Sequence, residues 1–506
     1  MIQQIDYFLD RITMYRLVLY SLIVLVVIAA TLSLFGAVPY SFMAIAFSTF
    51  ILVGVGWIAN KLFAWAFDAP ANSESIHITA LILVLIMSPI QTVTDVVPLA
   101  WTAILAVLSK FVLAINKKHI FNPAAIAVVI TSYALGVSAS WWVGTSWMAP
   151  FVAIVGFLII RKLRFTDLAW SFFMAVFAVS LFLTILKGSN PLKTIQQIVF
   201  HSSMLFMGSI MLTEPMTMPP TKRLQMIFGG LVGLLSVPQF SLLGFFFTPE
   251  LALCVGNIFA YIVSPKGKLL LTLYKKVQIS KDVMDFVFKP QGKLAYLPGQ
   301  YMEWTLPHTR PDTRGNRRYF TLASSPTEDT IRLGVKFYEN GSSYKKALQI
   351  LNQQTIVVGA QLAGEFTLPK NPHQKIAFLA GGIGITPFRS MIKYLIDMNE
   401  QRDIILIYSN KTVDEIAYTD VFTQAQKQLG IQVMYALTDM QQIPLGWQGS
   451  TGRVDAKMIK EHIPDYAERL FYLSGPQIMV KAYEDALKQL GVKHTKIKKD
   501  FFPGLV

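Results

Sequence analysis

Three segments in the C-terminal half of the chain carry residues suited to binding a flavin and a dinucleotide. The first, RRYFTLASSP at 317–326, contains Arg318, Phe320 and Thr321. A guanidinium can hold a pyrophosphate through two hydrogen bonds, and an aromatic ring can pack on an isoalloxazine ring. A hydroxyl can bond to the edge of that ring. The segment follows YLPGQYMEWTL, whose alternation after a Pro-Gly turn predicts a β-strand.

The other two segments are expected to bind phosphate through backbone amides. ENGSSYKKAL at 339–348 places Ser342 and Ser343 where a turn opens a helical stretch, which exposes N–H groups to an anion. IAFLAGGIGITPFRSMI at 376–392 is an apolar strand followed by a glycine turn and a helix, the geometry that cradles a dinucleotide phosphate. The residues expected at this turn are Gly381, Gly382, Gly384, Thr386 and Pro387.

These segments occur in an order that resembles the ferredoxin–NADP reductase superfamily. The resemblance covers roughly residues 269–506 and implies an FAD-binding β-barrel at 265–372 followed by an NAD(P)H-binding α/β domain at 373–506. It implies that Arg318, Phe320 and Thr321 bind FAD, that the two serines bind its pyrophosphate, and that the glycine turn binds NAD(P)H. The chain is then expected to be an NAD(P)H oxidoreductase.

The sequence departs from that family at positions close to the reacting rings. Phe320 replaces the usual tyrosine, which keeps the stacking and loses the hydroxyl. Ser474 and Gly475 match a Cys-Gly-Pro motif near the nicotinamide, with serine in place of cysteine. By resemblance, the C-terminal aromatic residue Phe501 or Phe502 covers the flavin. Ser474 and Phe502 are therefore the expected catalytic positions.

The choice between NADH and NADPH stays open in the sequence. Ser409, Lys411 and Tyr418 follow the apolar strand DIILIYSN and are candidates for binding a 2′-phosphate. The family usually has arginine for that task, so NADH is slightly favoured.

The N-terminal half has a different composition. The chain of 506 residues is 53% hydrophobic, and long apolar runs recur between residues 16 and 264. A membrane helix needs about 20 mostly apolar residues, so we expect a multi-pass α-helical membrane domain at 1–264. The ten expected spans are 16–38, 41–60, 76–91, 96–115, 120–138, 145–160, 167–186, 196–213, 224–243 and 246–263.

The charges predict both orientation and partners. Basic residues such as Lys61, Lys117 and Arg161 flank one set of span ends, whereas the opposite set holds only Lys187 and Lys193. The positive-inside rule then places both termini and the soluble half in the cytoplasm, and the connection after the seventh span outside. The net charge of +15 is dispersed, which favours contact with membrane lipid over nucleic acid.

Ten spans divide into two sets of five, and the second set is then inverted relative to the first. The third span ends in LILVLIMSP and the eighth in GSIMLTEPMTMPP. Corresponding breaks of this kind occur at the sites of inverted-repeat carriers. We therefore expect an inverted repeat.

This half, over about residues 16–264, resembles a family of ten-helix, inverted-repeat membrane proteins that bind flavin. Members of that family belong to the Rnf electron-transport complex and to the sodium-pumping NADH:quinone oxidoreductase. The motifs that carry the resemblance are NKKHIFNPAAIAVVI and GSIMLTEPMTMPP. In that family an outer loop carries FMN on a threonine. Asn190 stands at that place here, and its amide cannot form the ester. We therefore expect a second flavin, FMN or riboflavin, to be held non-covalently.

A single cysteine, Cys254, excludes an internal disulfide and a four-cysteine metal or iron–sulfur site. His77 and His201 are expected near opposite faces, which disfavours a shared haem, and no metal site is predicted. We expect electrons to pass from cytoplasmic NAD(P)H through FAD and the second flavin to a quinone or an external acceptor. The alternatives are a redox-driven sodium or ion pump component and a haem-containing transmembrane metal reductase. Whether the chain forms a homo-oligomer stays open.

Overall fold

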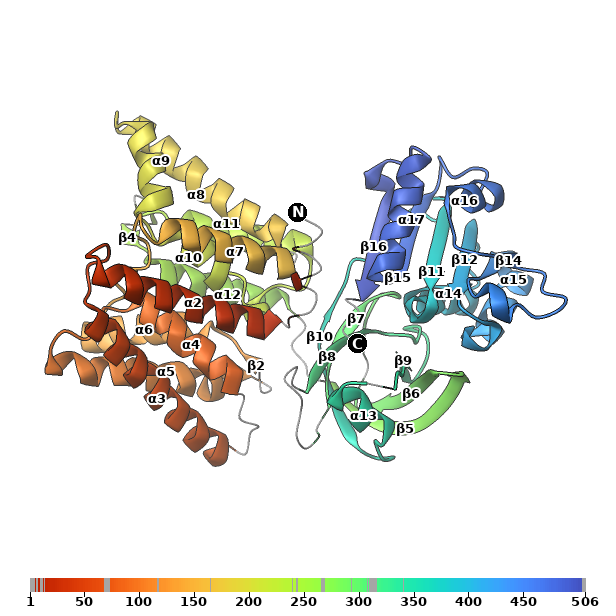
Figure 1. Cartoon of the computed structure of the whole chain (residues 1–506), viewed down its shortest axis with the longest axis horizontal. Coiled ribbons are helices and arrows are strands. Elements are labelled where there is room, and N and C mark those ends of the chain that lie inside the picture. The colour runs from red at the N-terminus through yellow and green to blue at the C-terminus, as the bar shows by residue number, and fades with distance from the viewer. Residues whose placement is uncertain are drawn as a thin grey trace. The chain divides into compact units, whose positions relative to one another are not determined.

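The computed structural model divides the chain into two compact units, Met1–Lys266 and Gly267–Val506. The first unit is helical, and the second contains two six-stranded sheets (Figure 1). The structure describes residues 5, 8–9, 12, 14–67, 73–115, 118–163, 165–238, 240–242, 244–264, 269–292, 294–306, 308, 316–339 and 341–502.

Apolar helices form the N-terminal unit, and several begin at a polar cap followed by proline. Asn122 and Thr248 cap α6 and α12 in this way, because their side chains accept a hydrogen bond from the backbone of the first turn. The helices are α2 (Met14–Leu34), α3 (Phe42–Ala66), α4 (Ser73–Ile86), α5 (Val96–Val112), α6 (Pro123–Leu135), α7 (Ala149–Leu163), α8 (Thr166–Leu186), α9 (Pro191–Phe200), α10 (Met204–Phe206), α11 (Lys222–Leu235) and α12 (Pro249–Val263).

Length separates these helices into two groups. Among the described residues, four segments are long and apolar enough to cross a membrane, namely α2, α3, α8 and Val93–Val112, which contains α5. The others have 15 residues or fewer. A 15-residue helix rises only about 22 Å, less than the roughly 30 Å hydrocarbon core. Helix length therefore supports four of the ten expected spans.

The helices of the N-terminal unit form two consecutive series, α2–α6 and α7–α12, and two contacts of the first series recur in the second. Helix α3 packs against α5, and α8 packs against α11. Helix α2 packs against α4, and α7 packs against α10 and the π-helical turn Met207–Met211 that follows it. Helix α4 and the π-helical turn Met207–Met211 are largely buried, as Leu83, Ile86 and Met207 show. The two series of helices thus share these two packing contacts.

The first sheet of the C-terminal unit is antiparallel, with the strand order β8-β7-β10-β5-β6-β9. Trp304, Phe286 and Phe288 fill its core, together with Tyr344 from the short helix α13 (Ser343–Gln349). The strands are β5 (Leu269–Ser280), β6 (Val283–Pro290), β7 (Tyr301–Thr305), β8 (Arg317–Thr321), β9 (Ile331–Lys336) and β10 (Ile356–Ala363).

The second sheet is parallel, with the order β14-β13-β12-β11-β15-β16. Helices α14 and α15 cover one face of this sheet, and α16 and α17 cover the other (Figure 1). The alternating side chains of the strands pack against these helices. The chain runs outward from β11 in both directions, so the ends of β11 and β15 form a topological switch point, where such sheets bind ligands. The elements are β11 (Ile376–Gly381), α14 (Thr386–Met398), β12 (Ile404–Asn410), α15 (Thr419–Leu429), β13 (Gln432–Leu437), β14 (Ser450–Thr451), α16 (Ala456–His462), β15 (Leu470–Pro476), α17 (Gln477–Gln489) and β16 (Ile497–Phe502).

Candidate active site

Strand β8 and helix α13 bring the first two sequence motifs together around Tyr344. Arg318 and Phe320 lie two residues apart, so they project from the same face of β8. The guanidinium carbon of Arg318 is 5.2 Å from the centre of the Tyr344 ring, and the Phe320 ring centroid is 5.9 Å away. Ser342 caps α13 by accepting a hydrogen bond from the Lys345 amide at 3.3 Å. The guanidinium of Arg318, the ring of Phe320 and the first turn of α13 therefore lie close together around Tyr344.

Thr321 ends β8 with a hydroxyl suited to a ligand edge. The residue is 3% exposed, and its Oγ1 has no hydrogen-bond partner among the described residues. A buried hydroxyl without a partner is costly, so a bound ligand that bonds to it would remove the cost. Next to this region, Ser343 Oγ lies 3.4 Å from His308 Nε2. Sequence reasoning missed His308, which belongs to no recognised motif, and Tyr344, which lies inside the segment ENGSSYKKAL but received no role there.

The glycine turn after β11 touches the loop after β15. A Cβ on Gly384 would lie 2.5 Å from the backbone of Gly475, and one on Gly381 would lie 1.9 Å from Met479 Sδ. Gly382 has a φ of 51°, a backbone conformation that favours glycine. Position 384 therefore has no room for a side chain, and position 382 favours glycine through its backbone conformation. The turn ends at Thr386 and Pro387 in the first turn of α14.

Ser474 lies beside this turn, because β15 pairs with β11 and aligns Ser474 with Ala380. It is fully buried, and its Oγ has no hydrogen-bond partner in the described part of the chain. Strand β16 aligns Phe502 with Pro476, so its backbone reaches the same sheet edge. The side chains of Phe501 and Phe502 lie outside the described residues. The two buried hydroxyls, Thr321 and Ser474, fit polar ring edges of the expected cofactors.

Tyr418 does not lie where a 2′-phosphate could reach it. It has left-handed backbone angles (φ 60°), is 4% exposed, and donates a hydrogen bond from its hydroxyl to Asp285 of strand β6 at 2.5 Å. The prediction for Tyr418 is therefore wrong, because its hydroxyl is used inside the protein. Of the other two candidates, Ser409 is buried and Lys411 is exposed.

Asn190 has a local structural role in the N-terminal unit. It is the N-cap of α9, and its Oδ1 accepts a hydrogen bond from the Leu192 amide at 2.9 Å. Lys187 and Lys193 on either side of it are exposed. Glu214, an ionisable residue directly after the eighth predicted span, lies 3.3 Å from His119.

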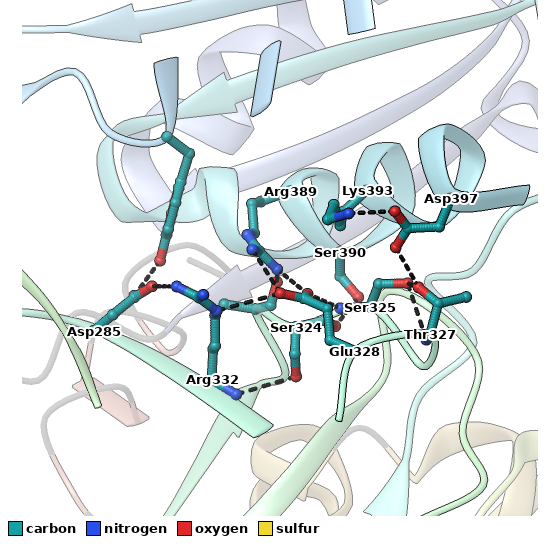
Figure 2. Close-up of polar contacts among 12 residues, drawn as sticks. Asp285, Ser324, Ser325, Thr327, Glu328, Arg332, Arg389, Ser390, Lys393 and Asp397 are labelled. Atoms are coloured by element: carbon teal, nitrogen blue, oxygen red, sulfur yellow. Dashed lines mark hydrogen bonds and ion pairs between the residues drawn. The ribbon is translucent and has the colours of Figure 1, made fainter. Parts of the chain in front are cut away.

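A buried group of charged residues joins the antiparallel sheet to the parallel one, and sequence reasoning missed it. Asp285 is 0% exposed, and Arg389 of α14 is 3% exposed. Burial raises the pKa of Asp285 above its ordinary value. Burial also opposes ionisation of Glu328, but the hydrogen bonds and charge of Arg389 outweigh it and lower the pKa of Glu328. Figure 2 shows these residues with their polar contacts.

Comparisons with known proteins agree with this geometry. An oxidoreductase FAD-binding domain family matches residues 270–363, and an oxidoreductase NAD-binding domain family matches residues 378–485. A flavohemoprotein of Oceanobacillus iheyensis is 25% identical over 45% of this chain, which spans 57% of that protein. NADH-cytochrome b5 reductase 1 of Aspergillus terreus is 29% identical over 46% of this chain and 80% of its own length.

Among solved structures, the cytochrome b5 reductase domain of Ulva prolifera nitrate reductase matches 47% of this chain and 98% of its own, with 22% identity and a TM-score of 0.42. The two domain families and the sequence relatives lie in the C-terminal half. That half is therefore an NAD(P)H oxidoreductase module with ferredoxin–NADP reductase-like FAD- and NAD-binding domains. The resemblance of the N-terminal half stays a prediction.

Proposed function

We propose that this chain takes electrons from cytoplasmic NAD(P)H through FAD and passes them into its own membrane domain. The observation that carries the proposal is the glycine turn packed on the Ser474–Gly475 loop, in the same unit as the cluster around Tyr344. The same chain holds four helices long enough to cross a membrane. A reductase module fused to such helices favours transfer to a membrane acceptor.

The residues of the module have distinct expected roles. Arg318 and the start of α13 hold the FAD pyrophosphate, Phe320 packs on the flavin, and Thr321 hydrogen bonds to its edge. The turn from Gly381 to Pro387 holds the dinucleotide phosphate of NAD(P)H, and Ser474 lies at the nicotinamide. When bound, FAD accepts an electron pair from NAD(P)H and releases the electrons singly.

The membrane side of the proposal rests on resemblance and on the repeated packing of the helices. Two series of helices with matching contacts support an inverted repeat of about ten segments, the shorter ones being broken or re-entrant. Asn190 caps α9 and has an amide where an ester would need a hydroxyl, so we propose that a second flavin would be held non-covalently. The terminal acceptor is then a quinone or an external compound.

A second candidate, a redox-driven ion pump, is favoured by buried polar groups in the helical unit. Lys110 Nζ donates hydrogen bonds to Ser75 Oγ and Thr79 Oγ1, both at 3.0 Å. Ionisable residues inside a membrane domain commonly serve ion pathways. Sodium-dependent NADH oxidation that generates a voltage in vesicles favours the pump, whereas sodium-independent transfer favours the simple relay.

Cofactor identification on the purified full chain tests the proposal. We expect a flavin spectrum that NAD(P)H bleaches, more than one flavin per chain, and complete release of flavin by acid. Fluorescence that remains on the denatured polypeptide would refute non-covalent binding. A Soret band would favour the haem-containing reductase instead.

A further inference from the structure

We propose that five residues, Asp285, Glu328, Arg332, Arg389 and Tyr418, form an interdomain clamp that positions the nicotinamide against the flavin. Three belong to the flavin-binding domain and two to the nicotinamide-binding domain. The inference rests on the proposed function of the module. It assigns the clamp a positioning role in electron transfer, in addition to its contribution to folding.

The first half of the clamp ties α14 to the chain that leaves the flavin strand β8. Arg389 donates one hydrogen bond to the Ala323 carbonyl at 2.8 Å and others to both carboxylate oxygens of Glu328, one of them at 3.0 Å. Glu328 also accepts from the Ser325 amide at 2.7 Å, and Ser390 Oγ donates to the Ser324 carbonyl at 2.5 Å (Figure 2). Arg389 follows Pro387 of the phosphate turn by two residues, and Ala323 follows Thr321 by two. The contact therefore links the two predicted cofactor sites by very short chain segments.

The second half ties α15 to strand β6. The Tyr418 hydroxyl donates to Asp285 Oδ1, and the Arg389 guanidinium lies 5.7 Å from the Tyr418 ring centre. Arg332 joins the two halves, because its guanidinium lies 3.5 Å from Asp285 Oδ2 and 3.3 Å from Glu328 Oε1. Across the boundary between the domains, the carboxylates of Asp285 and Glu328 thus face the guanidinium of Arg389 and the hydroxyl of Tyr418. Arg332 bridges the two carboxylates from within their own domain.

Two glycines of the flavin domain allow the close approach that the clamp holds. A Cβ on Gly334 of β9 would lie 2.5 Å from the Tyr418 hydroxyl and 2.9 Å from Thr386 Cγ2. A Cβ on Gly299 would lie 2.4 Å from Met391 Cε on α14. Strand β9 therefore contacts Thr386 of the phosphate turn itself, and any larger residue would push the turn away.

A positioning role explains why charged residues fill this boundary. Buried ion pairs contribute little net stability compared with apolar packing, whereas their directional contacts specify one arrangement. Hydride transfer needs such an arrangement, because the C4–H bond of the nicotinamide breaks as a bond to flavin N5 forms. The hydride carries two electrons from NAD(P)H to FAD, and a misplacement of about 1 Å can slow such a step by roughly a hundredfold.

The test compares Arg389→Lys with Arg469→Lys in the full-length protein. Arg469 is equally buried, at 4% exposure, and bonds Asp465, Asp403 and the Ile376 carbonyl, but it lies wholly inside the nicotinamide-binding domain. Lysine keeps the charge and loses the forked geometry in both variants. Stopped-flow spectroscopy gives the limiting rate of flavin reduction, the apparent Kd for NADH and NADPH, and the long-wavelength charge-transfer absorbance of the nicotinamide–flavin complex.

We expect Arg389→Lys to keep its FAD and its nucleotide Kd while the limiting rate falls about tenfold or more. The charge-transfer absorbance should weaken in parallel, and Arg469→Lys should keep the wild-type rate. If Arg389→Lys does not fold, Gly334→Ala is expected to give the same loss. A rate within about twofold of wild type in the folded clamp variant, or an equal loss in Arg469→Lys, overturns the clamp. If wild type itself shows no flavin reduction by either nucleotide, the proposed function fails first.

Discussion

Arg317 and Arg318 are neighbours on β8 with different surroundings. Arg317 points away from the predicted flavin site and lies 3.8 Å from Glu303, whereas Arg318 faces Tyr344. Hydrogen bonds to a charged group are worth about 1.5–3 kcal/mol. We therefore expect Arg318→Ala to raise the Kd for FAD about tenfold to a hundredfold, measured by fluorescence titration of the deflavinated protein. Arg317→Ala removes the same charge and should leave the affinity near wild type; equal losses in both would argue against a specific contact.

Glu328 predicts an acid-sensitive contribution to stability. Its pKa is lowered from 4.5 in the folded state, because Arg389, Ser325 and Arg332 together outweigh the effect of burial. The stability that it provides is therefore complete above pH 4.5 and is lost as the pH falls through the lowered pKa. Asp285 shifts in the opposite direction, so a comparison with Glu328→Gln isolates the effect of Glu328.

We expect Glu328→Gln to lower the Tm at pH 7, with the difference from wild type shrinking as the pH falls below about 4.5. Thermal denaturation from pH 3.5 to 7.5 measures it. Glu468, with a side chain 66% exposed, offers the control Glu468→Gln, which should change the Tm little. A Tm difference for Glu328→Gln that stays constant with pH would contradict this assignment.

For single residues, the sequence predicts a role where residues of suitable chemistry lie close together in one short segment. Arg318, Phe320 and Thr321 lie within four positions, and the glycines mark their own turn. Asp285 and Tyr418 are 133 positions apart, and neither belongs to a motif. Arg389 and Ser390 stand inside the recognised segment FRSMI, but only the fold reveals that they bond to the flavin-binding domain. Local sequence patterns therefore do not predict contacts between the two domains.

Among the elements, β11 and β15 determine where the nicotinamide turn lies. Their pairing places Gly384 against Gly475 with no room for a side chain. Forcing a methyl group into such a contact costs about 1–3 kcal/mol. We expect Gly384→Ala to weaken NAD(P)H binding about tenfold or more while FAD stays bound.

Isothermal titration with NAD(P)H, together with flavin content, measures this effect. Gly430→Asn is the control, because Gly430 ends α15 with a φ of 69° and open space around its Cβ position, and asparagine tolerates that conformation. Unchanged nucleotide affinity in Gly384→Ala would show that the turn does not hold the dinucleotide.

The helices of the N-terminal unit show what a hydropathy pattern can and cannot predict. The runs at 16–38 and 167–186 correspond to α2 and α8, which have 21 residues each. The run at 196–213 instead covers the second half of α9, a break at residues 201–203, and α10 with its π-helical turn. Hydropathy reports apolar composition, whereas Ser, Thr and Asn N-caps and the prolines that follow them decide where a helix begins. The existence of these apolar helices was therefore predictable from the sequence, but their lengths were not.

For the whole molecule, the central question is whether the two units exchange electrons. The C-terminal unit has its cofactor-binding domains, and the N-terminal unit has the apolar helices and a resemblance to flavin-binding membrane proteins. The single cysteine leaves no four-cysteine iron–sulfur relay within this chain. A direct route through flavins is the simplest arrangement that these residues allow.

Electron transfer across reconstituted vesicles tests this account most directly. The full chain is inserted into vesicles that contain ubiquinone in one preparation and trapped ferricyanide in another, and NAD(P)H is added outside. The account predicts that NAD(P)H oxidation reduces the quinone or the trapped ferricyanide, and that Gly384→Ala lowers either signal when NAD(P)H is not saturating. If NAD(P)H reduces the bound FAD while both acceptors stay oxidised, the proposed transfer into the membrane domain is contradicted.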